Sequence, residues 1–376
     1  MSKLEKRKKK LKKSWERLPE KIKSLSSRLR SLIDRSNASK IAIEVTGGMG
    51  DHILAARFIR DLMQELPDIR FDIYCVRPGL GRWIFESLRQ CDNILDRKAD
   101  ISVLRHQYMC TVRVATFVEV SRVKLKPRSP VPPVLQGIID RVTAACSKIE
   151  PIVSSYPALD GYLGHYAVMK GARRHNLLHQ MAGIRYGGDA LPLTRDAGAL
   201  NKHGLVKGQY ITISNGYDED AQRPGNALIT KVYPHFGDVA HLLKISRPDL
   251  KIVQIGSSTS TLIQGADLNL INKTTLQEAA TLIEHAALHV DNEGGLVHLA
   301  SALGTRSCVV FGPTLADYFG YEGNINVAPR TCGGCWWMEP TWMTNCVKGH
   351  AHPPCMYTQQ ASDVAAQIER GLRAIP

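Results

Sequence analysis

The sequence contains no long hydrophobic run. A membrane-spanning helix needs roughly 18 or more consecutive apolar residues, and no stretch of the 376 residues approaches that length. The basic N-terminus also lacks the apolar segment of a secretory signal. We therefore expect a cytoplasmic protein. At this length, and with 44% hydrophobic residues, the chain can form two domains that each bury a core.

Acidic residues are scarce in residues 1–40, which contain many lysines and arginines. This segment carries most of the net charge of +14, and the rest of the chain is nearly neutral. A nearly neutral body argues against the extended basic surface of a nucleic-acid-binding domain. In residues 1–39, apolar residues recur at helical spacing opposite a cationic face. Three interpretations stay open: a solvated tail, an amphipathic helix on an anionic membrane surface, or an RNA-binding tail.

Cysteine is sparse over most of the chain and concentrated near its end, where four residues lie close together: Cys332, Cys335, Cys346 and Cys355. The first pair has the two-residue spacing of a metal-binding knuckle. In a reducing compartment such a cluster favours metal binding over disulfides, and a set of buried thiols is the alternative. Four thiolates suit both zinc and iron. The other five cysteines stand in mostly apolar surroundings and are expected in the core: Cys75, Cys91, Cys110, Cys146 and Cys308.

Short β-type runs alternate with helical patterns along much of the chain. Residues 40–46 (KIAIEVT) predict a strand, residues 52–65 a helix and residues 71–76 a second strand. Residues 77–200 are harder to assign, and the alternation resumes over residues 209–312. Such units build doubly wound parallel sheets, which bind ligands at the carboxyl ends of their strands. We therefore predict an α/β protein with two doubly wound domains.

One short segment, residues 289–314 (HVDNEGGLVHLASALGTRSCVVFGPT), combines a carboxylate, two glycines and a helix start. The first turn of a helix presents unpaired N–H groups, and glycine lets a phosphate approach that backbone closely. Glu293 beside Gly294 and Gly295 is placed to accept hydrogen bonds from ribose, and His298 would follow one turn into the helix. The alternative is a tight turn with Glu293 as a simple charge at the helix start.

A second glycine-rich turn, GGMGD (47–51), follows the first predicted strand. Its Asp51 is a candidate site residue, because a carboxylate at a glycine-rich turn after a strand stands where such folds bind ligands. The alternative is that Asp51 only caps the following helix.

The stretch EGGLVHLASALGTRSCVVFGPT (293–314) closely resembles the signature of glycosyltransferase family 9, the bacterial heptosyltransferases. The family usually has Asp at the position of Glu293 and a small hydroxyl residue at that of Gly294. The turn at 47–51 resembles the family's Gly-x-Gly-Asp, in which Gly48, Gly50 and Asp51 match.

Two further stretches share this resemblance. In NALITKVYPHFGDV (226–239), Lys231 matches a family lysine that is followed by an aromatic residue and proline. Ser214 and Asn215 stand where the family places hydroxyl residues near phosphate, and Thr274 is expected at the edge of the base pocket. The alternatives are a surface lysine for Lys231 and a helix cap for Thr274.

The resemblance implies the GT-B fold, in which two Rossmann-like domains face each other across a cleft. The expected division is a basic tail (1–39), an acceptor-binding domain (40–200), a nucleotide-sugar-binding domain (201–330), a four-cysteine loop (331–358) and a C-terminal helix (359–376).

The resemblance also implies an inverting transfer of heptose from ADP-heptose, with Asp51 as the base. Lys231, the Glu293–Gly295 turn and His298 would hold the donor, because a lysine and a helix N-terminus can balance a diphosphate without magnesium. We expect neither nicotinamide nor flavin. The acceptor would be the lipopolysaccharide core, reached from the cytoplasmic side of the inner membrane through the basic tail. It would otherwise be serine hydroxyls of an autotransporter, whose heptosyltransferases resemble this chain in having a four-cysteine iron site.

Two other classes of function remain as alternatives: a GT-B nucleotide-sugar epimerase, and a non-catalytic, metal-stabilised nucleic-acid binder. The wording of the signature and the Gly-Asp pair argue against the first, and the nearly neutral body argues against the second. A homo-oligomer is also compatible with the sequence.

Overall fold

The computed structural model of the chain describes residues 40–96, 108–121, 131–217 and 229–373. The basic tail, residues 1–39, lies outside these ranges, and its helix and its membrane role stay predictions. Among the described residues, no helix combines the length and the apolar character needed to cross a bilayer.

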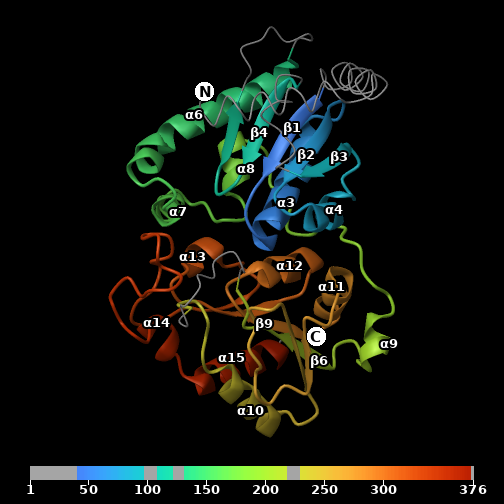
Figure 1. Ribbon diagram of the computed structural model, residues 1–376, viewed down its shortest axis with the longest axis vertical. Helices are drawn as coiled ribbons and strands as arrows, with labels where there is room; N and C mark the ends of the chain where they lie inside the picture. The colour runs from blue at the N-terminus through green and yellow to red at the C-terminus, as the bar shows by residue number, and fades with distance from the viewer. Residues whose placement is uncertain (1–39, 97–107, 122–130, 218–228, 374–376) are drawn as a thin grey trace, which may run out of the picture.

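The first half of the chain folds around a five-stranded sheet with the order β3-β2-β1-β4-β5 (Figure 1). All neighbouring strands in it are parallel except β4 and β5. Helices α3 and α4 pack near β1–β3, and α6 and α8 pack near β5. We call this part the N-terminal domain. Its elements are β1 (Lys40–Val45), α3 (Met49–Glu65), β2 (Arg70–Cys75), α4 (Pro78–Phe85), β3 (Cys91–Asp96), β4 (Cys110–Val114), β5 (Val118–Ser121), α6 (Pro133–Ser155), α7 (Asp160–Met169) and α8 (Leu177–Ala182).

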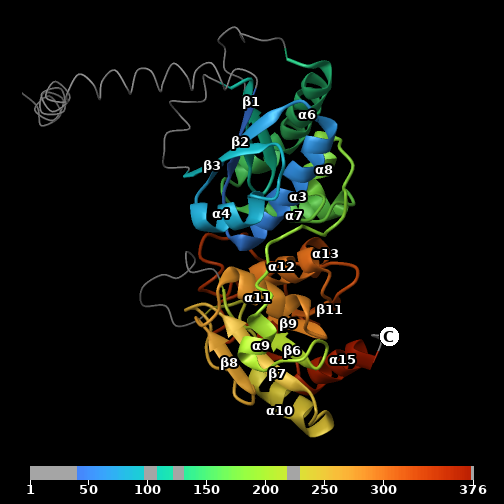
Figure 2. The ribbon, with the colours of Figure 1, turned by 90° about the vertical axis from the view of Figure 1, so that its right-hand side faces the viewer.

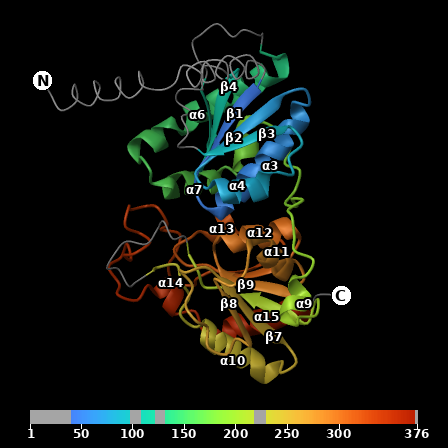
Figure 3. The ribbon, with the colours of Figure 1, turned by 45° about the vertical axis from the view of Figure 1, so that its right-hand side comes forward.

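The second half folds around a six-stranded parallel sheet with the order β11-β10-β9-β6-β7-β8. We call this part the C-terminal domain. The chain reaches it along one side of the molecule through α9 (Ala199–His203) (Figure 3). Its elements are β6 (Tyr210–Ile213), α10 (Phe236–Ser246), β7 (Lys251–Gly256), β8 (Leu268–Ile271), α11 (Leu276–Glu284), β9 (Leu288–Asn292), α12 (Gly295–Leu303), β10 (Ser307–Val310), α13 (Ala316–Phe319), β11 (Ile325–Val327), α14 (Pro354–Tyr357) and α15 (Ala361–Arg373).

The hydrophobic core connects the two domains. One cluster of buried side chains runs from the N-terminal sheet into α11 and α12, and it includes Leu299, Tyr318 and Trp336. A second cluster lies beneath α10 and α15 on the C-terminal sheet. Figure 2 shows the consequence: α3 and α7 of one domain lie directly above α12 and α13 of the other. The ends of α3 and α12 therefore meet at the boundary between the domains.

The predicted elements of the two glycine-rich units are present, with shifted ends. Helix α3 begins at Met49 rather than residue 52, because Gly48 is its N-cap and Asp51 occupies the third helical position. The interpretation of Asp51 as an N-cap residue is therefore wrong, although its carboxylate does accept the Gly48 N–H at 3.0 Å. Thr275 caps α11, and α12 ends at Gly304, whose φ of 81° suits glycine.

Candidate active site

A cavity of about 1190 Å³ lies between the domains, and its wall contains most of the predicted site residues. The N-terminal domain contributes the turn Gly48–Asp51, and the C-terminal domain contributes the loop with Lys231 and the turn Glu293–Gly295. Ser214, Thr274 and His298 also line it. Residues that are far apart in the sequence thus meet at the carboxyl ends of two parallel sheets, where such folds bind ligands.

The two glycine-rich turns bring two helix N-termini together at this cavity. A Cβ atom on Gly50 would lie 2.5 Å from Cδ2 of His298, and one on Gly295 would lie 3.1 Å from Cβ of Met49. These positions must stay small because α3 and α12 approach each other here. Gly47 has a φ of +93°, and a Cβ on it would collide with the Asp51 carboxylate. The positive ends of both helix dipoles therefore favour an anionic ligand.

Asp51 is fixed from two sides. Its Oδ2 accepts the Gly48 N–H, and its Oδ1 accepts a hydrogen bond from the Arg174 guanidinium at 2.7 Å. The Arg174 side chain is buried, whereas that of Asp51 is 39% exposed toward the cavity. A carboxylate has about four lone-pair sites, so these two bonds leave Asp51 able to accept a further proton donor.

Arg174 also joins the parts of the site. Its guanidinium donates to the carbonyl groups of Ala115 and Thr116, in the turn between β4 and β5. Its backbone N–H donates to the carbonyl of Tyr318 in the C-terminal domain at 2.8 Å. Arg174 was not predicted from the sequence, because it stands in the run GARRHN, which matches no pattern of a binding or catalytic site.

Lys231, Glu293 and His298 form a connected group in the C-terminal domain. The Lys231 ammonium lies 3.1 Å from Oε2 of Glu293, and both side chains are largely buried. Nε2 of His298 lies 3.9 Å from Oε1 of the same carboxylate. Burial, followed by the nearby Arg57 and Arg174 guanidinium groups, holds the pKa of His298 well below its usual value. His298 is therefore neutral at pH 7.

Flanking contacts hold the Lys231 segment in place. The Thr230 hydroxyl donates to the Trp342 carbonyl at 2.7 Å, and the Tyr233 N–H donates to Oδ1 of Asn292 at 2.7 Å. Lys231 is thus anchored to the end of β9 and to the four-cysteine loop. The alternative interpretation of Lys231 as an ordinary surface lysine is wrong, because its side chain is 12% exposed and lines the cavity.

Asp291 also lines the cavity. Asp291 belongs to β9, as expected for a strand-end residue, and burial raises its pKa. Asn215 is not among the described residues that line the cavity. Its side-chain amide donates to the Thr261 carbonyl and hydroxyl, at 2.9 Å each, and accepts the Thr261 N–H. Asn215 therefore shapes a loop in this structure.

The four cysteines of the loop lie within electrostatic range of one another. Burial, and then the neighbouring thiols of Cys332, Cys335 and Cys346, raise the pKa of Cys355 to about 12. All four are free thiols. Within the described ranges, no three Cys, His, Asp or Glu side chains are arranged closely enough to hold a metal ion. The loop therefore gathers the predicted ligands, and metal binding stays a prediction.

Comparison with known proteins finds a family match for part of the chain and a shared fold for most of it. The model of glycosyltransferase family 9 (heptosyltransferase) matches residues 230–347. No curated protein matches the chain. The matched segment includes Lys231, Glu293 and His298.

Solved structures resemble nearly the whole chain. The iron-containing dodecameric glycosyltransferase TibC from enterotoxigenic E. coli has a TM-score of 0.57 at 15% identity, over 90% of this chain and 77% of that one. A family 9 glycosyltransferase from Veillonella parvula has a TM-score of 0.57 at 14% identity, over 90% and 98%. The E. coli ADP-heptose lipopolysaccharide heptosyltransferase II has a TM-score of 0.50 at 16% identity, over 89% and 98%. These likenesses establish the GT-B fold, and residues 230–347 of the C-terminal domain match the model of glycosyltransferase family 9.

Proposed function

We propose that the chain transfers heptose from ADP-heptose to an acceptor hydroxyl group, with inversion at the anomeric carbon. The observation that carries this proposal is that Asp51, Lys231, Glu293 and His298 line one cavity at two helix N-termini. The solved structures that resemble the chain include TibC in complex with ADP-D-β-D-heptose. That likeness supports the choice of donor.

In this proposal the diphosphate of the donor lies between Lys231, His298 and the N-terminus of α12. Lys231 supplies the charge that balances the leaving group, and neutral His298 donates one hydrogen bond. The open space around Gly294 lets an oxygen atom of the diphosphate reach the backbone, since a Cβ there would meet nothing within 4 Å. Glu293 accepts hydrogen bonds from the ribose hydroxyls, while Ser214 and Thr274 lie at the edge of the nucleotide pocket.

Asp51 would act as the general base. The acceptor oxygen forms a bond to the anomeric carbon, the bond from that carbon to the diphosphate breaks, and ADP leaves with its electron pair. The proton of the acceptor hydroxyl passes to Asp51. Arg174 donates a hydrogen bond to this carboxylate and orients it at the cavity.

We propose two further properties that accompany this activity. The first is a structural iron or zinc ion held by Cys332, Cys335, Cys346 and Cys355, a proposal that rests on the spacing of these cysteines in the sequence. The second is a homo-oligomer in the cytoplasm, peripheral to the inner membrane. TibC is described as dodecameric and iron-containing, which supports testing both properties together. Elemental analysis that finds neither metal in stoichiometric amount would refute the first.

Titration calorimetry with ADP tests the donor site. We expect Lys231→Ala to weaken ADP binding about tenfold or more, because a hydrogen bond to a charged group contributes about 1.5–3 kcal/mol. Lys244→Ala is a matched control, since Lys244 pairs with Asp267 at 3.0 Å on the far surface of the C-terminal domain. Equal ADP affinities in the two variants, or no ADP binding by the native protein, would contradict the proposal.

Transfer assays then separate the acceptors. The protein is incubated with ADP-heptose and either lipopolysaccharide core oligosaccharide or a serine-rich autotransporter polypeptide, and the products are identified by mass spectrometry. NMR of the new glycosidic bond reports whether the anomeric configuration is inverted. Release of free ADP-sugar epimer without transfer would instead favour an epimerase.

A further inference from the structure

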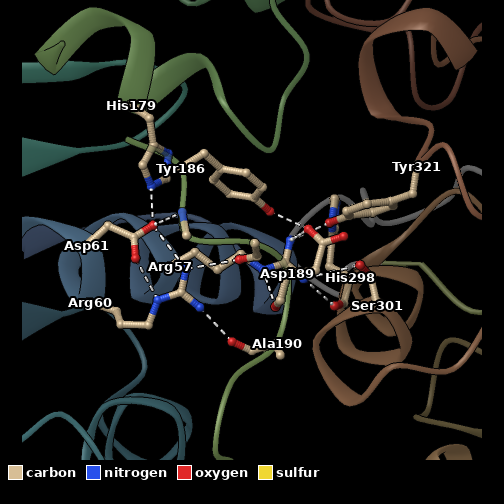
Figure 4. Close-up of polar contacts among 12 residues, drawn as sticks. Arg57, Arg60, Asp61, His179, Tyr186, Asp189, Ala190, His298, Ser301 and Tyr321 are labelled. Carbon is tan, nitrogen blue, oxygen red and sulfur yellow. Dashed lines mark hydrogen bonds and ion pairs between the residues drawn. The ribbon is translucent and has the colours of Figure 1, made fainter. Parts of the chain in front are cut away.

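A buried hydrogen-bonded chain connects the N-terminal domain to His298 (Figure 4). Arg57, in the middle of α3, has a side chain that is 0% exposed. Its Nη1 donates to the hydroxyl of Tyr321 at 2.7 Å. That hydroxyl in turn lies 2.6 Å from Nδ1 of His298. This hydrogen-bonded chain therefore ends on Nδ1 of His298, the ring nitrogen that faces away from Glu293.

The hydrogen atoms along these hydrogen bonds indicate the tautomer of His298, that is, which of its ring nitrogens carries hydrogen. A guanidinium group only donates hydrogen bonds, so the Tyr321 oxygen accepts from Arg57. Burial raises the pKa of Tyr321, so the phenol keeps its own hydrogen atom. His298 is neutral and has one nitrogen without hydrogen. The phenol hydrogen needs an acceptor, and Nδ1 of His298 lies 2.6 Å away, so this geometry favours donation from Tyr321 to Nδ1, with the hydrogen of His298 on Nε2.

The surroundings of the ring fix the direction of that hydrogen. Gly50 lies against Cδ2 of His298, where even a Cβ atom would be too close. On the other side, Arg57 donates to the His298 carbonyl at 3.5 Å and to the Ser301 hydroxyl at 3.3 Å. The contact of Cδ2 with Gly50 and that of Nδ1 with Tyr321 hold the ring so that Nε2 faces Glu293 and the cavity.

We propose that Arg57 and Tyr321 are positioning residues that hold His298 as the Nε2–H tautomer, so that it donates a hydrogen bond to the diphosphate of the bound donor. The proposal rests on the proposed function in one respect, namely that a diphosphate occupies the cavity. It assigns to the contact between the domains a chemical role in addition to a structural one. Arg57 comes from the N-terminal domain, while Tyr321 and His298 belong to the C-terminal domain. The interdomain segment takes part as well, because Asp189 lies 3.3 Å from Nη1 of Arg57.

Long-range ¹H–¹⁵N correlation spectra of protein labelled with ¹⁵N-histidine test the tautomer directly. The His298 signals are assigned by their loss in His298→Asn. We expect hydrogen on Nε2 in the native protein, and a shift toward the Nδ1–H form in Tyr321→Phe. Tyr210→Phe is the matched control, because Tyr210 is a buried tyrosine whose hydroxyl donates to the Leu282 carbonyl at 2.7 Å. Hydrogen on Nδ1 in the native protein, or an unchanged tautomer in Tyr321→Phe, would overturn the proposal.

ADP affinity measured on the same three proteins supplies the second readout. We expect Tyr321→Phe to weaken ADP binding about fivefold to tenfold, the value of one hydrogen bond, and Tyr210→Phe to leave it unchanged. Equal affinities of both variants would overturn the positioning role. The tautomer is measured without nucleotide and in the native protein, so it stands even where a variant fails to fold. Hydrogen on Nε2 with no ADP binding would refute the proposed function and leave the assignment of the tautomer intact.

Discussion

Asp51 is the residue on which the chemistry of the site depends most directly. Its carboxylate is held by Arg174 and the Gly48 N–H, yet it remains accessible from the cavity. We expect Asp51→Asn to lower kcat by about a hundredfold or more, because general base catalysis contributes about 10²–10⁴. The affinity for ADP should stay within about twofold, since Asp51 belongs to the N-terminal domain and the proposed ADP-binding residues belong to the C-terminal domain. Steady-state kinetics and calorimetry measure the two quantities.

The substitution Asp51→Asn leaves Arg174 without its charged partner, so the controls must show that the variant still folds. A thermal melt separates a loss of folding from a loss of chemistry. Asp160→Asn is a suitable comparison, because Asp160 also lines the cavity and accepts a hydrogen bond from Thr116. Nearly native turnover by Asp51→Asn would exclude Asp51 as the base.

Some residues of the candidate site could be predicted from the sequence, and others could not. Asp51, Lys231, Glu293 and His298 were identified by their resemblance to a family, and the structure brings them to one cavity. Arg174 and Tyr321 had no such signal, because their partners are more than a hundred or about twenty residues away and become neighbours only after folding. Arg57 did carry a signal: it is a charged residue in the middle of the apolar stretch HILAARFIRDLM.

At the level of elements, the approach of α3 to α12 makes Gly50 sensitive to substitution. We expect Gly50→Ala to destabilise the protein by about 1–3 kcal/mol, the usual cost of forcing an extra carbon into a packed contact. It should also weaken ADP binding, because the added Cβ collides with Cδ2 of His298. Urea denaturation and calorimetry measure the two effects.

Gly137→Ala is the matched control for that prediction. Gly137 lies within α6, and a Cβ there would meet only the flexible end of Arg141, at 3.4 Å. Replacing glycine by alanine inside a helix usually stabilises it by about 0.5–1 kcal/mol. If Gly50→Ala also stabilised the protein, the close packing of the two helices would not be a constraint.

The pattern of elements was predictable where strands are buried and helices are amphipathic. Strand β1, predicted at residues 40–46, was assigned nearly to the residue, because a continuous apolar strand followed by glycine is distinctive. The N-terminal domain beyond β2 was not assigned. Its strand β3 (CDNILD) is polar and half-exposed at the sheet edge, and β5 is a four-residue antiparallel strand. Such short edge strands have no distinctive period.

For the whole molecule, the sequence predicted two Rossmann-like domains but not how they dock. The docking depends on a buried polar network that starts on α3 and extends into the segment between the domains (Figure 4). Arg57 donates to the Asp189 carbonyl at 2.7 Å, and Arg60 donates to the Gly188 carbonyl at 2.9 Å. Contacts of this kind join positions separated by well over a hundred residues. No local sequence pattern predicts them.

Asp61 gives this network a measurable dependence on pH. The carboxylate is 2% exposed and accepts hydrogen bonds from His179 at 2.9 Å, from Arg60 at 2.7 Å and from the Gly187 N–H at 2.8 Å. Burial alone would raise its pKa, but the bonds from His179 and Arg60 outweigh burial and lower the pKa to about 2. Because the unfolded chain binds this proton at higher pH than the folded one, acid favours unfolding. The stabilisation is complete above about pH 4 and is lost as the pH falls toward 2.

We therefore expect Asp61→Asn to lower the free energy of unfolding by about 2 kcal/mol at pH 7. The difference between native and variant proteins should shrink steadily as the pH is lowered from about 4 to 2, where the native carboxyl group becomes protonated. Urea denaturation at a series of pH values measures this difference. Asp249→Asn is the control, because Asp249 pairs with Arg247 on the exposed surface, where an ion pair contributes little to stability. A difference for Asp61→Asn that is small at pH 7, or that does not change below pH 4, would show that the contact between α3, α8 and the interdomain segment does not depend on an ionised Asp61.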